Sequence, residues 1–340
     1  MIGVGVIGYG YWGPNLVRNF AALPDARVAA VADGRPGRLD QVRRAWPGAT
    51  PYASAEELIA DPAVNAVAIA TPVWTHYPLA KQALEAGKHV LLEKPLCETG
   101  AKARELIEIA AARNLVLLVD HTFSYTGAVR TIKQLIDAGD LGEIYYYDSV
   151  RINLGLFQPD VSVLWDLAVH DLSIMDYVLG GRQPLAVSAT GQAHVSTLPE
   201  DVAYLTLYFS DNLIAHFHVN WLSPVKLRKT LIGGSKKMIV YDDLEAAEKV
   251  KIYDKGLIFE VGDEQRDEMR LRGYRSGDVW SPQVDLTEAL KTEMQHFVRC
   301  IEGTEKPLTD GESGWRVVRV LEAADKSMKQ KGAPVEVPKS

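Results

Sequence analysis

The chain opens on the segment IGVGVIGYGYWG at residues 2–13, a short apolar run followed at once by a glycine loop. The run at 2–7 is compact and β-branched, which is typical of a strand buried on both faces. In the loop, Gly8 permits a tight turn, Gly10 lets the backbone approach a pyrophosphate, and Gly13 lets the next helix pack closely. Because the loop lies between a predicted strand and a predicted helix, it indicates a dinucleotide site.

Asp33 supports this interpretation, because it ends the second predicted strand twenty residues beyond Gly13. An acid at that place hydrogen-bonds the adenosine ribose hydroxyls, while the helix N-terminus offers free N–H groups to the phosphates. A carboxylate there repels a 2′-phosphate, which favours NAD over NADP. Arg35 and Arg38 are close in sequence and could still accommodate NADP.

The first part of the chain alternates short apolar strands with helical patterns. We expect strands at 2–7, 28–32, 66–70, 89–92 and 115–119, and helices at 12–22, 38–46, 75–86 and 99–113. This alternation is typical of βαβ units. It predicts a doubly wound α/β domain with a parallel sheet, a Rossmann domain, over residues 1–122.

The pattern changes after about residue 120, where extended runs with period two dominate. We expect helices at 128–138, 165–179, 287–302 and 313–331, and strands at 143–153, 185–194, 203–209, 213–220, 226–232, 237–241, 250–253 and 257–261. These patterns predict an α+β domain over residues 123–340 with a mostly antiparallel sheet. The charged segment 262–282 is expected to be a loop, either a mobile one or one that contacts substrate or another subunit.

Composition excludes several classes of function. The 340 residues carry 37 Lys and Arg against 44 Asp and Glu, a net charge of −7, which gives no electrostatic reason to bind nucleic acid. No apolar stretch approaches the roughly 18–20 residues that cross a bilayer. The two cysteines, Cys97 and Cys300, are far apart, and the N-terminus lacks a basic signal segment. We therefore expect a cytoplasmic protein with no membrane or nucleic-acid partner.

Two further segments follow predicted strands of the first domain, at 71–76 and 93–95. Ligands of doubly wound sheets bind beyond the carboxyl ends of the strands. Pro95 disfavours a helical conformation at Lys94, so the chain must turn after its strand. From spacing alone, Lys94 would be interpreted as a surface charge on that turn.

Together these segments resemble the Gfo/Idh/MocA oxidoreductase family over essentially the whole chain. The resemblance rests on the glycine loop with Asp33, Ala70-Thr71-Pro72 with His76, 86–90 leading to Glu93-Lys94-Pro95, Leu141-Gly142-Glu143-Ile144, Trp165-Asp166-Leu167-Ala168-Val169-His170-Asp171 and Pro307-Leu308-Thr309-Asp310-Gly311. It implies a Rossmann domain and a second domain with a large open sheet. Such sheets commonly form subunit interfaces, so a homodimer or homotetramer is expected.

The resemblance also implies the catalytic residues Lys94, Asp166 and His170. Positions i and i+4 share one helix face, so Asp166 and His170 can point into one cleft. The imidazole suits a general base, Asp166 can orient it, and Lys94 can stabilise an alkoxide or relay its proton. Which of Lys94 and His170 takes the proton first stays open. Many relatives carry an acid three residues after this histidine, whereas this chain has Ser173 there and Asp171 beside the histidine.

The remaining expected site residues fall into two sets. The cofactor set is Gly8, Gly10, Tyr11, Trp12, Gly13, Asp33, Thr71, His76, Glu93, Lys94 and Trp165. The substrate set is Lys94, His121, Arg151, Asn153 and His170. For His121, simple packing is an equal alternative, and for Arg151 and Asn153 the alternatives are a solvated ion pair and a strand-end amide.

The substrate expectation comes from a more local resemblance, at 8–20 and 151–155, to nucleotide-sugar dehydrogenases of this family. It implies NAD-dependent oxidation of the 3-hydroxyl of a UDP-N-acetylhexosamine or its uronate. Alternatives are a free polyol or inositol dehydrogenase, a deoxysugar ketoreductase, and a non-catalytic NAD(P)-sensing regulator. Retention of Lys94, Asp166 and His170 argues against the regulator.

No metal is expected. His216 and His218 would share one strand face, but no third ligand is evident, so core or interface packing is the favoured interpretation. Asp166, His170 and Asp171 could also ligate a metal, yet the resemblance implies hydride chemistry without one.

Overall fold

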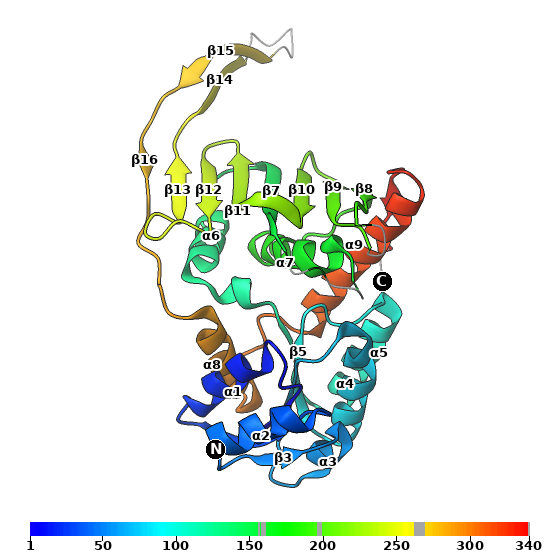
Figure 1. The fold of residues 1–340 in the computed structure, drawn as a ribbon. Helices are drawn as coiled ribbons and strands as arrows, with labels where there is room; N and C mark the ends of the chain where they lie inside the picture. The colour runs from blue at the N-terminus through cyan, green and yellow to red at the C-terminus, as the bar shows by residue number, and fades with distance from the viewer. Residues whose placement is uncertain (156, 158–160, 196–198, 262–268, 339–340) are drawn as a thin grey trace. The chain divides into compact units, whose positions relative to one another are not determined.

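The structure is a computed structural model that describes residues 1–155, 157, 161–195, 199–261 and 269–338 (Figure 1). Its contacts divide the chain into two units, one of residues 1–126 with 287–322 and one of residues 127–286 with 323–340. The expected division after residue 122 gave all later residues to the second domain. Segment 287–322 instead belongs to the first unit, because its helix buries an apolar face there.

The first unit contains a six-stranded sheet in the order β3-β2-β1-β4-β5-β6, and every pair is parallel. Its strands are β1 (Ile2–Ile7), β2 (Ala26–Ala32), β3 (Thr50–Tyr52), β4 (Ala66–Ile69), β5 (His89–Glu93) and β6 (Leu117–Asp120). This order confirms the predicted doubly wound Rossmann sheet. The strand order changes direction between β1 and β4, which are neighbours in the sheet but not in the chain. Such a reversal creates the crevice where these sheets bind dinucleotides.

Helices pack on this sheet through apolar faces. They are α1 (Gly13–Ala21), α2 (Pro36–Ala45), α3 (Ala55–Ala60), α4 (His76–Glu85), α5 (Gly100–Ala112), α8 (Ala289–Ile301), and the short 3-10 helices η1 (Val73–Thr75) and η2 (Thr122–Tyr125); α9 (Gly311–Lys329) begins here and continues into the second unit. Phe297 of α8 meets Phe20 of α1 edge to face at 6.3 Å, in a core that includes Leu16 and Met294. Burial of these side chains attaches α8 to the first unit.

The second unit contains a nine-stranded sheet in the order β16-β13-β12-β11-β7-β10-β9-β8-β17. Its strands are β7 (Ile144–Leu154), β8 (Ala186–Gln192), β9 (Val202–Tyr208), β10 (Ile214–Asn220), β11 (Leu222–Gly234), β12 (Met238–Asp242), β13 (Val250–Tyr253), β16 (Val279–Trp280) and β17 (Val335–Glu336). Only β7 and β10 form a parallel pair among these neighbours in the described chain, so the sheet is mostly antiparallel, as predicted.

One expectation for this unit is wrong. Within the segment expected to be a loop, β15 (Met269–Arg275) pairs antiparallel with β14 (Gly256–Val261), and β16 extends the main sheet. Backbone pairing, which charge and glycine content do not reveal, makes these residues strands. Residues 262–268 of that expected loop lie outside the described residues.

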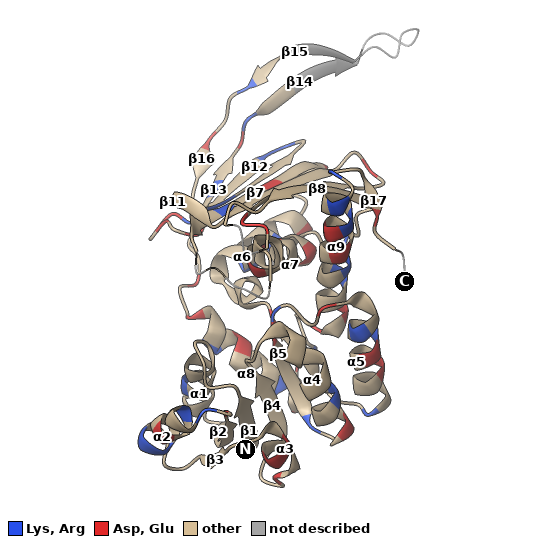
Figure 2. Ribbon diagram, turned by 45° about the vertical axis from the view of Figure 1, so that its right-hand side comes forward, with Lys and Arg blue, Asp and Glu red and all other residues tan. Residues whose placement is uncertain are grey.

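The large sheet has one face covered by helices. Figures 1 and 2 show α6 (Gly127–Asp137) and α7 (Val169–Val178) on the same side of the sheet. Along β9, Leu205 and Leu207 are buried while Tyr204 and Tyr208 are exposed, which follows the predicted period of two. Assembly into a dimer or tetramer stays a prediction. Among the described residues, no helix is long and apolar enough to cross a membrane.

Candidate active site

The glycine loop has the backbone geometry that its sequence predicts. Gly8 has a φ of +95°, and a Cβ there would lie 2.4 Å from the carbonyl oxygen of Ala70. A Cβ on Gly13 would lie 2.0 Å from the carbonyl oxygen of Gly8, so only glycine lets α1 begin so close to the loop. At Gly10 a Cβ would approach nothing nearer than Arg35 at 3.6 Å, which leaves that backbone open to a ligand.

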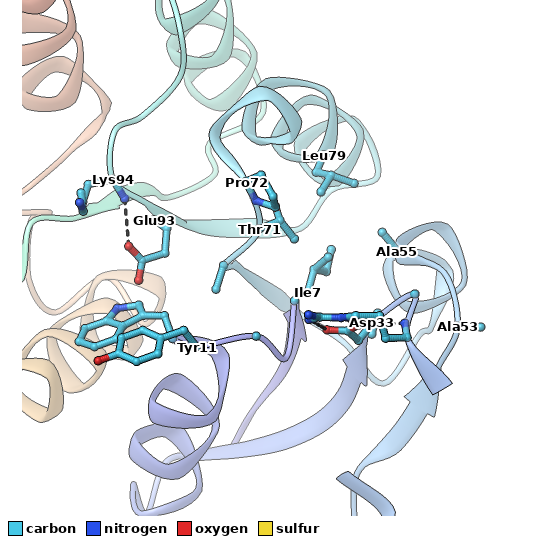
Figure 3. Close-up of a pocket in the computed structure, with 17 residues that line it drawn as sticks. Ile7, Tyr11, Asp33, Ala53, Ala55, Thr71, Pro72, Leu79, Glu93 and Lys94 are labelled. Atoms are coloured by element: carbon cyan, nitrogen blue, oxygen red, sulfur yellow. Dashed lines mark hydrogen bonds and ion pairs between the residues drawn. The ribbon is translucent and has the colours of Figure 1, made fainter. Parts of the chain in front are cut away.

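A pocket of about 690 Å³ opens beyond the carboxyl ends of β1, β2, β4 and β5 (Figure 3). It is lined by Ile7, Gly8, Gly10, Tyr11, Trp12, Ala32, Asp33, Gly34, Arg35, Ala53, Ala55, Ala70, Thr71, Pro72, Leu79, Glu93 and Lys94. Eight of the expected cofactor residues are in that wall. The volume is in the range of small-molecule sites, and the residues present fit a dinucleotide.

Asp33 is held as a carboxylate acceptor at the end of β2. Its oxygens accept from the backbone N–H groups of Tyr9 at 2.8 Å and Arg35 at 2.9 Å, and from the Arg35 guanidinium at 2.8 and 2.7 Å. Burial raises the pKa of Asp33, but these hydrogen bonds outweigh burial and leave the pKa below its ordinary value. The group is therefore ionised at neutral pH. The Arg35 side chain is 61% exposed, whereas the Asp33 side chain with which it pairs is 4% exposed.

Tyr11 and Trp12 form an aromatic pair in the wall, with ring centroids 6.2 Å apart and planes within 13°. The indole Nε1 of Trp12 donates to Asp120 at 3.3 Å. Figure 3 shows the Glu93 side chain pointing toward the ring of Tyr11. This arrangement gives the pocket a flat apolar surface beside ionisable groups.

Three expected cofactor residues do not line the pocket. Gly13 is buried at the start of α1, where it serves packing. His76 is 1% exposed, and its two ring nitrogens lie 2.9 Å from the carbonyl oxygens of Pro95 and Thr71. Burial lowers its pKa, so His76 holds the pocket loops together rather than facing a ligand. Trp165 belongs to the second unit, where its Nε1 donates to Asp325 at 2.8 Å.

Lys94 follows β5 and lines the pocket, and its peptide bond to Pro95 is cis. Its backbone N–H donates to Glu93 at 3.2 Å. His121, at the end of β6, is 1% exposed, and neither ring nitrogen has a hydrogen-bond partner within the described chain. Burial, with the charges of Lys94 and Arg316, lowers the pKa of His121 to about 3, so this imidazole is neutral.

Two acidic residues were missed by sequence analysis. Asp120 pairs in register with Glu93 across β5 and β6, and it accepts from the Thr122 hydroxyl and from Trp12. Glu293 on α8 is fully buried. The rule that ligands lie beyond strand ends could have identified Asp120. Glu293 could have been found as an acid on an apolar helix face.

Asp166 and His170 are in the second unit, on one continuous helical segment. Asp166 lies in a π-helical turn, η3 (Leu164–Ala168), and His170 lies in the first turn of α7. Such turns are frequent at functional sites. Asp166 accepts from Nε1 of Trp221 at 3.2 Å, and both Asp166 and His170 are partly exposed. Ser173 donates its hydroxyl to the carbonyl oxygen of His170 at 2.7 Å.

Arg151 does not have the environment expected of a substrate contact. It is 2% exposed, and its guanidinium donates to both oxygens of Asp171 at 2.6 and 3.2 Å. The ion-pair alternative therefore holds, with the difference that the pair is buried rather than solvated. The pair also gives Asp171 a buried cationic partner. Asn153 is partly exposed near the end of β7.

The other histidines considered above lie on the sheet. The rings of His216 and His218 lie 6.4 and 4.4 Å from that of Tyr204. In the part of the chain that the structure describes, no group of three or more His, Cys, Asp or Glu side chains is arranged to hold a metal ion.

Comparison with known proteins agrees with this geometry. Residues 2–121 match the oxidoreductase family with an NAD-binding Rossmann fold, and residues 129–240 match the GFO/IDH/MocA C-terminal domain. An uncharacterized oxidoreductase, YdgJ of Escherichia coli, is 36% identical over 73% of both chains. UDP-N-acetylglucosamine 3-dehydrogenase of Acidithiobacillus ferrooxidans is 30% identical over 92% of this chain and 93% of its own. The solved structure of that enzyme, GnnA, has a TM-score of 0.81 at 26% identity and covers 97% of this chain and 99% of its own.

Proposed function

Because this chain belongs to the Gfo/Idh/MocA oxidoreductase family, we propose that it oxidises or reduces a sugar ring hydroxyl with NAD as the cofactor. The reacting position proposed is C3 of a UDP-N-acetylhexosamine or its uronate. One observation carries the proposal: Lys94 lines the same pocket as the glycine loop and Asp33. The Lys94 side chain is thus placed beside the residues that would bind a dinucleotide.

The residues of the first unit would hold the cofactor. The open backbone at Gly10 and the N-terminus of α1 would take the pyrophosphate, and Asp33 would accept from the adenosine ribose hydroxyls. When bound, the nicotinamide ring supplies the acceptor for the hydride that an alcohol loses on oxidation. The ionised state of Asp33 supports NAD over NADP.

Lys94, Asp166 and His170 would carry out the proton transfer. An alcohol loses its hydroxyl proton as it becomes a ketone, so the site needs a base and a cation for the developing alkoxide. An imidazole suits the role of the base, so we assign it to His170, and Asp166, one turn earlier, would orient it. Lys94 would stabilise the alkoxide or relay its proton. Lys94 belongs to the first unit and the other two to the second, and their convergence is part of the proposal.

The substrate class rests on the named relative. UDP-N-acetylglucosamine 3-dehydrogenase matches nearly the full length of this chain, and its structure superimposes over most of it. A nucleotide-sugar enzyme should need the UDP group, whereas an inositol or polyol dehydrogenase should not.

The test is NADH formation in purified protein supplied with NAD⁺ and one candidate substrate at a time. UDP-N-acetylglucosamine, its uronate, free N-acetylglucosamine and myo-inositol form the panel. We expect absorbance at the NADH band with a UDP sugar and none with the free compounds. If inositol alone were turned over, inositol and not a UDP sugar would be the substrate. If protein that binds NADH turned over none of the compounds, the proposed reaction would be contradicted.

A further inference from the structure

Glu293 is a fully buried acid for which the proposed chemistry gives no role. It lies on α8 between Leu290 and Phe297, on the face that packs into the core of the first unit. Within the described chain neither of its carboxyl oxygens has a hydrogen-bond partner of good geometry, although the nearby Thr122 hydroxyl lowers its pKa. An ionised carboxylate in such a place would be costly, so its position calls for a proton or a partner.

Two side chains act directly on the Glu293 carboxyl group, those of Asp120 and Thr122. Asp120 is 2% exposed and already accepts from the hydroxyl of Thr122 and the indole of Trp12. On its other side it neighbours Glu93, its register partner in β5. One Glu93 oxygen accepts from the backbone of Lys94, and the other has no donor among the described residues.

Three adjacent carboxyl groups in a buried place cannot all be ionised, because like charges at short range oppose one another. A contact between two carboxyl groups becomes a hydrogen bond when one of them keeps its proton. Burial and the charge of Asp120 raise the pKa of both Glu93 and Glu293 well above the ordinary value. The ionisable groups that face Glu293 are Asp120, Glu93 and Tyr125, and none is a cation.

We propose that Glu293 is a positioning residue that, as a neutral acid, donates a hydrogen bond to Asp120. Asp120 is thereby held as the acceptor of the Trp12 N–H, and the indole is fixed in the wall of the cofactor pocket. A side chain on α8, outside the Rossmann sequence, thus shapes the dinucleotide site. The inference rests on the proposed function only in that the pocket binds NADH.

The experiment compares NADH affinity, by fluorescence titration, among four test variants and one control variant. Glu293→Gln keeps a neutral donor and should bind within about twofold of the unaltered protein. Glu293→Leu removes the donor and should weaken binding about tenfold, as should Trp12→Phe. In the double variant, Glu293→Leu with Trp12→Phe, the two losses of NADH affinity should not add, because both substitutions break the same chain of contacts. Glu288→Gln, an exposed acid just before α8 that pairs with Arg18, is the matched control and should change nothing.

A second measurement does not depend on binding. At neutral pH the infrared C=O stretch of protonated carboxylic acids should be present in the unaltered protein and weaker in Glu293→Gln, by the contribution of Glu293. Absence of that difference, a Gln variant as weak as the Leu variant, or additive losses would each overturn the inference. If the unaltered protein fails to bind NADH, the proposed function fails, and the infrared result still decides the state of Glu293.

Discussion

The guanidinium of Arg35 forms a two-pronged ion pair with the carboxylate of Asp33, at 2.8 and 2.7 Å. The pair lies in the wall of the pocket, where the adenosine ribose of a dinucleotide would bind. We infer that Asp33 would disfavour a 2′-phosphate by charge repulsion, and that it also pairs with the guanidinium that such a phosphate would need. On this proposal, the choice between NAD and NADP depends on Asp33 in two ways.

We expect Asp33→Ser to reverse the cofactor preference. Loss of a charged acceptor should weaken NADH binding by about ten- to a hundredfold. Release of Arg35 should improve NADPH binding, because a guanidinium pairs well with phosphate. Titration of both cofactors measures this. Adding Arg35→Ala should abolish the gain for NADPH, and a Ser variant that still prefers NADH would show that Asp33 does not select the cofactor.

The pair of Arg151 and Asp171 should matter for stability rather than chemistry. Both side chains are nearly fully buried, so Asp171→Ala removes the carboxylate that pairs with this buried guanidinium and should cost about 3–5 kcal/mol of unfolding free energy. The double variant with Arg151→Met should recover part of that loss. Chemical denaturation measures both. Unchanged stability with an altered pH profile of turnover would instead mean that Asp171 supports His170.

The buried acids predict a pH dependence of stability. The pKa of Glu293 is raised by folding, so its contribution to stability is complete below the ordinary value of 4.5 and is lost as pH rises through the folded-state pKa. Gln cannot lose this proton. The melting temperature of Glu293→Gln, relative to the unaltered protein, should therefore increase from pH 5 to pH 8. A constant difference in melting temperature across that range would show that the pKa of Glu293 does not differ between the folded and unfolded protein.

Sequence reasoning succeeded where local chemistry decides the structure. The glycine loop could be interpreted because Gly8 and Gly13 lie where any Cβ would meet backbone. Sequence reasoning failed where contacts between residues far apart in the chain decide the structure. The strand β3 has three residues and is defined by its pairing with β2, and α8 joins the first unit through the contact of Phe297 with Phe20.

The candidate site shows the same contrast. Lys94 was identified through the family resemblance, since spacing alone favoured a surface charge, and the pocket includes it. Arg151 was interpreted from the local resemblance and its strand position, with an ion pair as the alternative, and nothing in the sequence shows that the partner is Asp171, twenty residues later. Glu293 was missed because its partner Asp120 is far away in the chain.

Lys94→Ala and His170→Ala should separate chemistry from binding. If these groups act on the proton of the reacting hydroxyl, each variant should lose about 10²–10⁴-fold in turnover. NADH affinity should change far less, since the glycine loop and Asp33 remain. Steady-state kinetics and NADH titration measure the two effects. Equal losses in turnover and affinity would mean that these side chains hold the cofactor instead.

The most direct test follows the hydrogen that the proposed reaction moves. Purified protein is incubated with NAD⁺ and UDP-N-acetylglucosamine or its uronate carrying deuterium at C3, and the reduced cofactor is analysed by mass spectrometry. We predict NADH that carries the deuterium, together with a 3-keto sugar. Reduced cofactor without the label would contradict C3 as the reacting carbon, and no reduced cofactor with either sugar would contradict the nucleotide-sugar oxidation itself.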